Sequence, residues 1–267
     1  KLGFSLLLVS IALSSMLLIW VQKIKQSAKD SFSHSISGTD LIVGSRSGDI
    51  QLLLYTVFRQ GQAIANMSWA SLEAIASFPE VKWVVPVSLG DSHRGYPVLG
   101  TSVAYFDYYR FGRKQLLSFR QGERFSSSFD VVLGSEVAQK LGYELGKKIY
   151  LAHGITKGRL PVHKQHSFTV VGILARTGTP VDKTLHIPLA GMTALHLSPK
   201  KRGDLSFHLT PLSEMQLQPD SVTGCLVGLK SKLAIFSVQN RITSRFKEPL
   251  MAIIPGVTLS RLWSSIR

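Results

Sequence analysis

The chain has 267 residues, of which 45% are hydrophobic and 18% are charged, and this balance excludes an intrinsically disordered protein. Lysine and arginine number 31 against 16 aspartate and glutamate, which gives a formal net charge of +15. We therefore expect an anionic partner, for which nucleic acid, an anionic lipid surface and an acidic protein are the candidates. The single cysteine, Cys225, excludes an intrachain disulfide framework and a cysteine-based zinc site.

The N-terminal segment predicts a membrane anchor. Residues 2–21 carry no charge, and fifteen of these twenty side chains are apolar. A helix of this length spans about 30 Å, the thickness of the hydrocarbon core of a bilayer. Trp20 lies where an aromatic belt is expected, and lysines follow in the headgroup zone at Lys23, Lys25 and Lys29. Because residues 13–30 contain no proline or glycine, we predict one unbroken helix to residue 30.

Two other interpretations of this segment compete with the anchor. A cleaved signal peptide has a shorter apolar region of about 7–15 residues and a small-residue cleavage site, which is missing here. A buried core helix rarely needs twenty residues that are apolar all round. The lysines after the segment favour a cytoplasmic position for the domain that follows, but long domains translocate largely regardless of charge. The residues themselves therefore leave the orientation open.

Short apolar runs alternate with turn residues after the anchor. The elements expected in the first stretch are a buried strand at residues 40–44, a helix at residues 69–78 capped by Ser68, and a hairpin of residues 81–89 and 96–103 around a turn at residues 90–95. Residues 50–58 are strongly apolar and allow two interpretations. They form either a core helix or a hydrophobic surface for a partner or substrate, made by Ile50, Leu53, Leu54, Val57 and Phe58.

The C-terminal stretch repeats this order of elements. We expect a strand at residues 222–229, a helix after the cap Ser231 with its apolar stripe at Ile235, Val238, Ile242 and Phe246, and a strand at residues 251–254. A strand, a helix and a strand in each half predict a split βαβ sheet with helices on one face.

The segment between these halves has a different character. Its expected strands are residues 129–133, 146–152, 168–174 and 184–189, with a helix at residues 136–141 that ends at Gly142. Residues 111–212 therefore predict a smaller β-rich domain inserted into the first.

Motifs that carry chemistry are weak in this chain. Residues 142–148 resemble a phosphate-binding loop, but the spacing is one residue short and no Ser or Thr follows the lysine. His153, His163 and His166 share a loop with three cations, which disfavour a metal ion. Asp91 and His93 are expected in a tight turn. The aromatic and basic residues 105–113 lack any recognisable nucleic-acid motif. We therefore expect no catalytic, cofactor or metal site, and no nucleic acid.

Three motifs in order resemble one family. Residues 132–146 match the pattern V-L-G-x-x-V-A-x-x-L-G…G, and residues 170–182 match V-V-G-I…T-G-T-P-V-D. Residues 259–263, Leu-Ser-Arg-Leu-Trp, resemble an amphipathic segment that leads into a second membrane helix. Together these segments resemble the MacB-like/FtsX-like permeases of ABC transporters over nearly the whole chain.

The resemblance implies an α+β fold with an N-terminal transmembrane helix. It divides the chain into the membrane helix and its extension at residues 1–30, a Porter-like split βαβ domain at residues 31–110 and 213–256, an inserted Sabre-like β-rich domain at residues 111–212, and the lead-in at residues 257–267. The family has a cytoplasmic N-terminus and four membrane helices, with the extracytoplasmic domain between the first and the second.

The function implied by the resemblance is transport rather than catalysis. The chain is expected to be the extracytoplasmic part of a permease in the bacterial inner membrane, with its ATPase on a separate chain and no cofactor of its own. Expected partners are that ATPase, a second permease subunit, membrane lipid and a periplasmic adaptor protein. A single-pass membrane sensor or ligand-binding ectodomain is the alternative.

Overall fold

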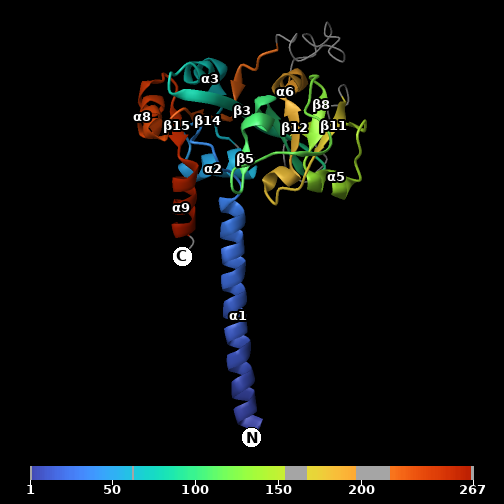
Figure 1. Cartoon of the computed structure of the whole chain (residues 1–267), viewed down its shortest axis with the longest axis vertical. Helices are drawn as coiled ribbons and strands as arrows, with labels where there is room; N and C mark the ends of the chain where they lie inside the picture. The colour runs from blue at the N-terminus through green and yellow to red at the C-terminus, as the bar shows by residue number, and fades with distance from the viewer. Residues whose placement is uncertain (1, 62, 154–166, 197–216, 266–267) are drawn as a thin grey trace.

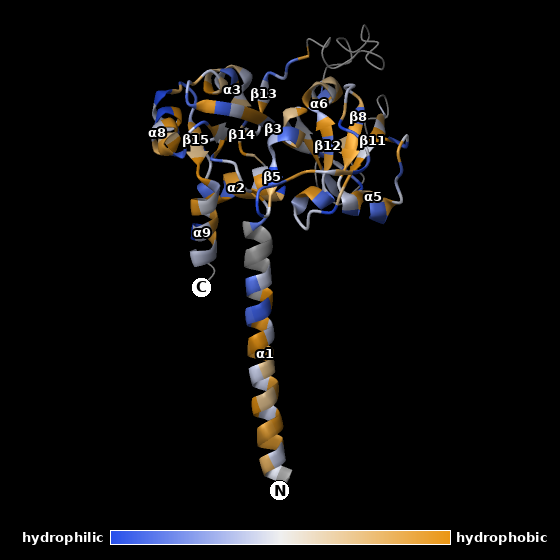
Figure 2. Ribbon diagram, viewed as in Figure 1, coloured by the Kyte–Doolittle hydropathy of each residue, from blue (hydrophilic) through white to orange (hydrophobic). Residues whose placement is uncertain are grey.

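The structure is a computed structural model that describes residues 2–61, 63–153, 167–196 and 217–265. Figure 1 shows one long helix, α1 (Leu2–Ser33), which stands below a globular domain. The helix is unbroken over 32 residues, which confirms the prediction made from the missing proline and glycine. Among the described residues, its segment Gly3–Ile24 is the one helix long and apolar enough to cross a membrane, and none of it is buried. Figure 2 shows the hydrophobic residues along this part of α1 in orange.

A mixed sheet of eleven strands organises the domain, with the order β15-β1-β14-β3-β4-β12-β8-β11-β7, while β10 pairs with β3 and β9 with β11. Its strands are β1 (Leu41–Ser45), β3 (Val81–His93), β4 (Tyr96–Thr101), β7 (Phe119–Gly122), β8 (Asp130–Leu133), β9 (Lys148–Ile149), β10 (Ala152–His153), β11 (Phe168–Leu174), β12 (Leu185–Pro188), β14 (Gly224–Leu229) and β15 (Leu250–Ile253). Two small ladders join β2 (Met67–Ser68) to β13 (Ser221–Val222) and β5 (Arg110–Phe111) to β6 (Gln115–Leu116).

Helices connect and cover these strands. They are α2 (Asp49–Phe58), α3 (Trp69–Ala76), α4 (Ala104–Tyr108), α5 (Ser135–Leu141), α6 (Leu189–His196), α8 (Ile235–Arg245) and α9 (Pro255–Ser265), with the 3₁₀ turns η1 (Pro180–Lys183) and η4 (Lys232–Ala234). The predicted caps are confirmed, since the Ser68 side chain accepts a hydrogen bond from Ser71 N and the Ser231 side chain accepts one from Leu233 N. Gly142 ends α5 in the left-handed conformation, as expected.

Strand pairing places a C-terminal strand between two N-terminal ones. β14 lies antiparallel between β1 and β3, with Cys225 opposite both Val43 and Pro86. β1 and β3 therefore run in the same direction, and a strand from the far end of the sequence separates them. β15 completes this half by pairing with the other edge of β1.

Helices cover both faces of this half, so the prediction that they lie on one face is wrong. Ile42 and Leu226 belong to a core cluster with α2, whereas their neighbours Leu41 and Val227 pack with α3 and α8 on the opposite face. Every residue of β1 and β14 is buried. A strand that is apolar on both sides needs cover on both sides, and α2 supplies the second layer.

The sheet continues without a gap into the segment predicted to be a separate insertion. β12 runs parallel to β4 and antiparallel to β8, and β8 runs parallel to β11. A second core cluster, built around Val131, Phe168 and Ile187, lies in this half. The division at residues 111 and 212 stays a prediction, and part of the segment lies outside the described residues.

Two strands differ from their predicted limits. β3 extends to His93, so the hairpin turn shrinks to Arg94 and Gly95, which both have positive φ angles of 49° and 84°. This matches a two-residue turn of the type that suits twisted hairpins. Residues 146–152 do not form one strand, because β9 pairs with β11 whereas β10 pairs with β3.

The last helix runs back toward α1. Figure 1 shows α9 descending beside the upper part of α1, on the same side of the domain. Pro255, Thr258 and Leu259 are buried against the domain, while Leu262 and Trp263 pack at the margin of the core around α2. The amphipathic character predicted for residues 257–267 is therefore present in α9.

Candidate functional site at the junction of α1 with the domain

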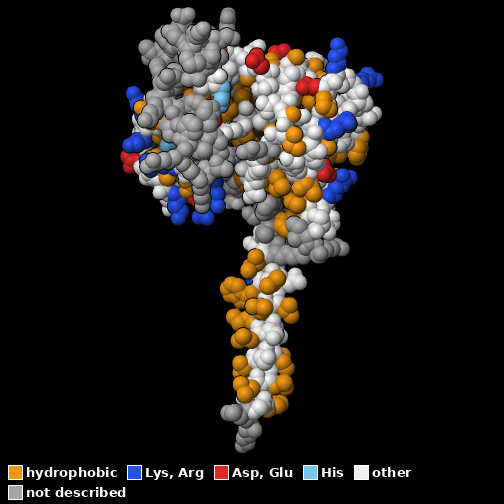
Figure 3. Space-filling view, turned by 180° about the vertical axis from the view of Figure 1, so that it is seen from behind, with side chains coloured by type: hydrophobic (Ala, Val, Ile, Leu, Met, Phe, Trp, Pro, Cys, Tyr) orange, Lys and Arg blue, Asp and Glu red, His pale blue; other side chains and the backbone are white. Residues whose placement is uncertain are grey.

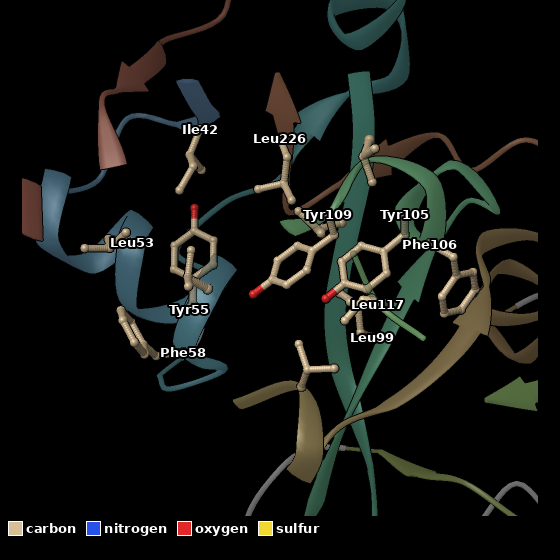
Figure 4. Close-up of a cluster of buried hydrophobic side chains, with 14 of the residues drawn as sticks. Ile42, Leu53, Tyr55, Phe58, Leu99, Tyr105, Phe106, Tyr109, Leu117 and Leu226 are labelled. Atoms are coloured by element: carbon tan, nitrogen blue, oxygen red, sulfur yellow. The ribbon is translucent and has the colours of Figure 1, made fainter. Parts of the chain in front are cut away.

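The five residues predicted as a partner or substrate surface lie on α2, and the structure buries most of this helix. Leu53 and Val57 are each 1% exposed and Phe58 is 6% exposed, whereas Ile50 and Leu54 are half-buried. Figure 4 shows Leu53 and Phe58 inside a packed cluster. The surface interpretation is wrong for Leu53, Val57 and Phe58, because α2 covers an apolar face of the sheet. The core-helix alternative is correct.

A different site emerges where α1 joins the domain. The His34 carbonyl accepts a hydrogen bond of 2.8 Å from Gly112 N, and Ser37 N donates one of 2.8 Å to the Arg110 carbonyl. Between them the buried Ser35 carbonyl accepts a hydrogen bond from the Tyr109 hydroxyl. We call residues 34–38 and 109–112 the junction. Because its backbone is bonded on both sides of Ser35, α1 passes into the domain without a free linker.

Tyr109 is positioned by the core. Its ring stacks on Tyr105 with 4.7 Å between the centroids, and both side chains are buried (Figure 4). Burial raises the pKa of Tyr105 to about 12 and holds the pKa of Tyr109 well above its ordinary value. The Tyr109 hydroxyl therefore stays protonated and donates to Ser35. Leaving a buried partner of this kind unpaired costs about 1–3 kcal/mol.

A buried cation lies beside the tyrosine pair. Arg59 follows α2 in the left-handed conformation, with φ of 58°, and its Nη2 donates to the Tyr105 hydroxyl at 3.3 Å. Its side chain is 6% exposed, and within the described part of the chain Nε and Nη1 have no hydrogen-bond partner. Burying a charge that is only partly hydrogen-bonded costs desolvation free energy, so Arg59 lowers the stability of the fold unless its neighbours compensate.

The ring of His186 on β12 also lies against Tyr105, with 5.3 Å between the ring centroids. Burial, together with the Arg59 charge, lowers the pKa of His186 to about 3, so its ring is neutral at physiological pH. Residues from α2, α4 and β12 thus meet in one packed cluster directly behind the junction.

A chain of contacts joins the end of α1 to the core. The Ser35 carbonyl accepts a hydrogen bond from the Tyr109 hydroxyl, and the Tyr109 ring stacks on Tyr105. α9 is tied to the same body, because the Arg261 guanidinium lies 3.1 Å from the Asp49 carboxylate at the start of α2. This exposed ion pair contributes at most about 1 kcal/mol. α1 and α9 therefore leave the same region of the domain side by side.

The predicted turn residues Asp91 and His93 are instead buried at the end of β3. His93 Nδ1 lies 2.6 Å from the Tyr150 carbonyl and Nε2 lies 2.9 Å from the Tyr143 hydroxyl, so the ring serves the fold. Asp91 lies 3.5 Å from His196. Cys225 is buried as predicted, and burial raises the pKa of its thiol to about 12.

The remaining motifs also have structural explanations where the structure describes them. Gly142 caps α5 and Lys148 opens β9, which accounts for the loop that resembles a phosphate site. His163 and His166 lie outside the described residues. Within the described ranges, no group of three or more His, Cys, Asp and Glu side chains could hold a metal ion.

Sequence reasoning missed the junction. The aromatic run from Tyr105 to Phe111 was a visible signal, but its pairing with residues 34–38 depends on chain segments about seventy residues apart. No local pattern singles out Arg59, because an arginine after an apolar helix is ordinarily solvated.

Comparisons with known proteins agree with this architecture. A family model described as the MacB-like periplasmic core domain matches residues 5–245. No curated protein matches the chain in sequence. The crystal structure of the periplasmic region of MacB from Actinobacillus actinomycetemcomitans superposes with a TM-score of 0.52 at 14% identity, over 85% of this chain and 94% of that one.

A second crystal structure is of the extracellular domain of the noncanonical ABC-type transporter YknZ from Gram-positive bacteria. It has a TM-score of 0.46 at 14% identity and covers 80% of this chain and 98% of that one. The family match spans most of the chain, and the MacB structure has the same fold. The chain belongs to the MacB-like periplasmic core domain family, as the membrane-anchored extracytoplasmic domain of an ABC transporter permease.

Proposed function

We propose that this domain couples ATP hydrolysis by a separate ATPase chain to export or extraction of a substrate at the outer face of the bacterial inner membrane. The substrate class is a lipophilic compound, a peptide or a lipoprotein. The working unit is a permease dimer, with a periplasmic adaptor protein as a further partner. In this proposal the chain has no catalytic residue, and α1 carries the mechanical signal.

The observation that supports coupling is the continuity of α1 into the junction. A helix of 32 residues runs without a break to Ser33, and the next residues are hydrogen-bonded to the domain. A flexible linker would absorb a displacement of the membrane helix, whereas this connection passes it to Tyr109 and the core. We propose that α9 leads into a second membrane helix and shares the load, since it lies beside α1.

We also propose that the domain is divided into a split βαβ part, residues 31–110 with 213–256, and an inserted β-rich part, residues 111–212. The continuous sheet argues that they move as one body when α1 moves.

A linker insertion tests the coupling. In the complete permease with its ATPase, Gly-Gly-Ser-Gly inserted between Gln26 and Ser27 interrupts α1 above the span. Glycine disfavours helix by about 1 kcal/mol per residue, so the helix loses its continuity there. We expect ATP hydrolysis to persist and transport, measured as substrate efflux or release, to be lost.

The matched control inserts Ala-Glu-Ala-Lys at the same place. These residues favour helix and add about one turn, so the control changes length without adding flexibility. It should retain most of the transport. Normal transport with the glycine linker would contradict the proposal and favour a passive binding module, such as the ectodomain of a sensor.

The separate location of the ATPase has its own test. Calorimetry of the detergent-solubilised 267-residue chain with Mg-ATP should show no binding heat, because the loop at residues 142–148 lacks the spacing of a phosphate cradle. Micromolar binding would overturn this part of the proposal.

A further inference from the structure

The side of the domain that faces the membrane carries a polar cavity next to the junction. The cavity has a volume of about 700 Å³, and its lining includes Ser35, immediately after α1, and Arg59, at the end of α2. α1 leaves the domain on this side (Figure 1). Because α1 contains the membrane span, the cavity lies on the face of the domain turned toward the bilayer.

Cations outnumber carboxylates around this cavity. Lys140 on α5, Arg176 before η1 and Lys183 in η1 are exposed and line it, and the buried Arg59 adds a fourth positive charge. Figure 3 shows Lys and Arg side chains gathered on the underside of the half of the domain that contains α5. The surface is therefore positive where it faces the membrane.

The two carboxylates at the cavity are already engaged. Asp182 is buried and accepts hydrogen bonds from Thr177 N at 2.8 Å and Gly178 N at 2.7 Å. Glu136 lies 3.9 Å from Lys183, which is a loose and exposed ion pair. Four cations (Arg59, Lys140, Arg176 and Lys183) against these two carboxylates leave a formal charge of +2, so the cavity keeps a net positive charge.

The wall of the cavity is preformed. Gly134, which precedes α5, packs so closely on η1 that a Cβ there would lie 2.2 Å from the Val181 carbonyl oxygen. Gly134 N also donates a hydrogen bond of 2.9 Å to the Thr184 carbonyl. This packing fixes the backbone of η1, which carries Lys183, against the start of α5, the helix that carries Lys140.

The height above the membrane fits contact with headgroups. Nine residues of α1 separate Ile24 from Ser33, which is about 14 Å of helix at about 1.5 Å per residue. The headgroup layer occupies about 5–8 Å of this distance. The remaining gap is close to the Debye length of about 8 Å, and an ordinary span tilt of about 20° lowers one side of the domain further.

We propose that this cavity and the cations around it bind the phosphate of an anionic lipid headgroup in the facing leaflet. The contact fixes the tilt and rotation of the domain above the membrane. It requires that α1 spans the bilayer, and it is independent of the proposed coupling to an ATPase.

Hydrogen exchange of the whole chain in lipid nanodiscs tests the proposal. The amides of α5 and of residues 176–183 should exchange severalfold more slowly in phosphatidylglycerol nanodiscs than in phosphatidylcholine nanodiscs. High salt should remove this difference, because it screens the attraction. Equal exchange in the two lipids would overturn the proposal.

Charge variants give the matched comparison. Each cation near an anionic surface contributes about fivefold to binding, so K140Q/R176Q/K183Q should weaken the headgroup contact about a hundredfold and abolish the protection. The control K82Q/K232Q/K247Q removes the same charge from exposed positions beside α3 and α8. This variant should retain the slow exchange in phosphatidylglycerol nanodiscs. Protection that survives in the first variant would contradict the assignment.

Inorganic phosphate distinguishes the source of the anion. Millimolar phosphate added to phosphatidylcholine nanodiscs should leave exchange unchanged, because the proposed ligand is a lipid that the span holds at high local concentration. Full protection by free phosphate would overturn the lipid assignment and identify a site for a soluble anion.

Discussion

α1 and α2 are both strongly apolar helices, yet α1 is exposed along its apolar segment whereas α2 is largely buried. The Gly3–Ile24 segment of α1 has none of its length buried in the protein, whereas six of the ten residues of α2 are buried. Both helices have a hydrophobic composition, so composition does not decide whether they are buried in the protein. The length of the helix decides it, because 22 helical residues match the thickness of a bilayer and ten match the depth of a small core.

The difference extends to the way each helix ends. α1 ends at the surface of the domain, where backbone hydrogen bonds and Tyr109 hold the following residues. α2 ends inside the domain, where Arg59 turns the chain and leaves its guanidinium among aromatic rings. The end of α1 is attached to the outside of the domain, whereas the end of α2 belongs to its interior.

The largest expected effect compares equivalent leucines in the two helices. Leu53→Ala in α2 should lower the free energy of unfolding by about 3 kcal/mol, because it leaves a cavity in a closed core. Urea unfolding of the solubilised chain, followed by tryptophan fluorescence, measures this loss.

Leu13→Ala in α1 is the matched control, since Leu13 is 68% exposed. It should leave the unfolding of the domain unchanged. Equal losses for the two variants would mean that α1 also packs in the protein, which would remove the contrast between the helices.

The second effect concerns the buried end of α2. The pKa of His186 is about 3 in the folded chain, against an ordinary value of 6.5, so between these values the unfolded chain binds the extra proton. The contribution of His186 to the free energy of unfolding is fully present above pH 6.5 and falls by about 1.4 kcal/mol per pH unit below it. We expect a loss of about 2 kcal/mol between pH 6.5 and pH 5.

His186→Phe should remove this part of the pH dependence, whatever its effect at neutral pH. The comparison is made between variants because burial also lowers the pKa of His93, which acts in the same direction. An unchanged slope in His186→Phe would show that His186 is not enclosed behind Tyr105.

The smallest effect concerns the end of α1. Tyr109→Phe keeps the stacked ring but removes the hydrogen bond to Ser35, so unfolding should become easier by about 1 kcal/mol. Amide exchange at Ser37 should accelerate. Tyr108→Phe is the control, because the Tyr108 ring stacks on Trp83 and no described hydrogen bond uses its hydroxyl. The same acceleration in both variants would argue against the role of Tyr109 at the junction.

Much of the local structure could be predicted from the sequence. The strand at residues 168–174, the helix that begins after Ser68 and the cap at Gly142 follow from apolar runs and from residues with one preferred conformation. The extension of β3 to His93 could not be predicted. Its polar residues Asp91, Ser92 and His93 look like a turn until β10 pairs with two of them and the core encloses them.

The candidate site was predicted far less well. The apolar face of α2 was evident from the sequence. Whether this face packs on a partner or on the chain's own sheet depended on β14 and β15, which lie 170–200 residues away. The junction residues Ser35 and Tyr109 have no pattern of their own. Their roles come from one buried hydrogen bond across 74 residues of sequence.

The sequence by itself determined the membrane helix, the approximate limits of most of the elements it predicted, and the family motifs, because each depends on residues close together in the chain. The tertiary structure decided which apolar helix is covered, how the strands are ordered, and where α1 is attached. These features depend on contacts between distant segments. Several strand orders and helix positions satisfy the local patterns equally well, and the observed one is the arrangement that buries both faces of the sheet.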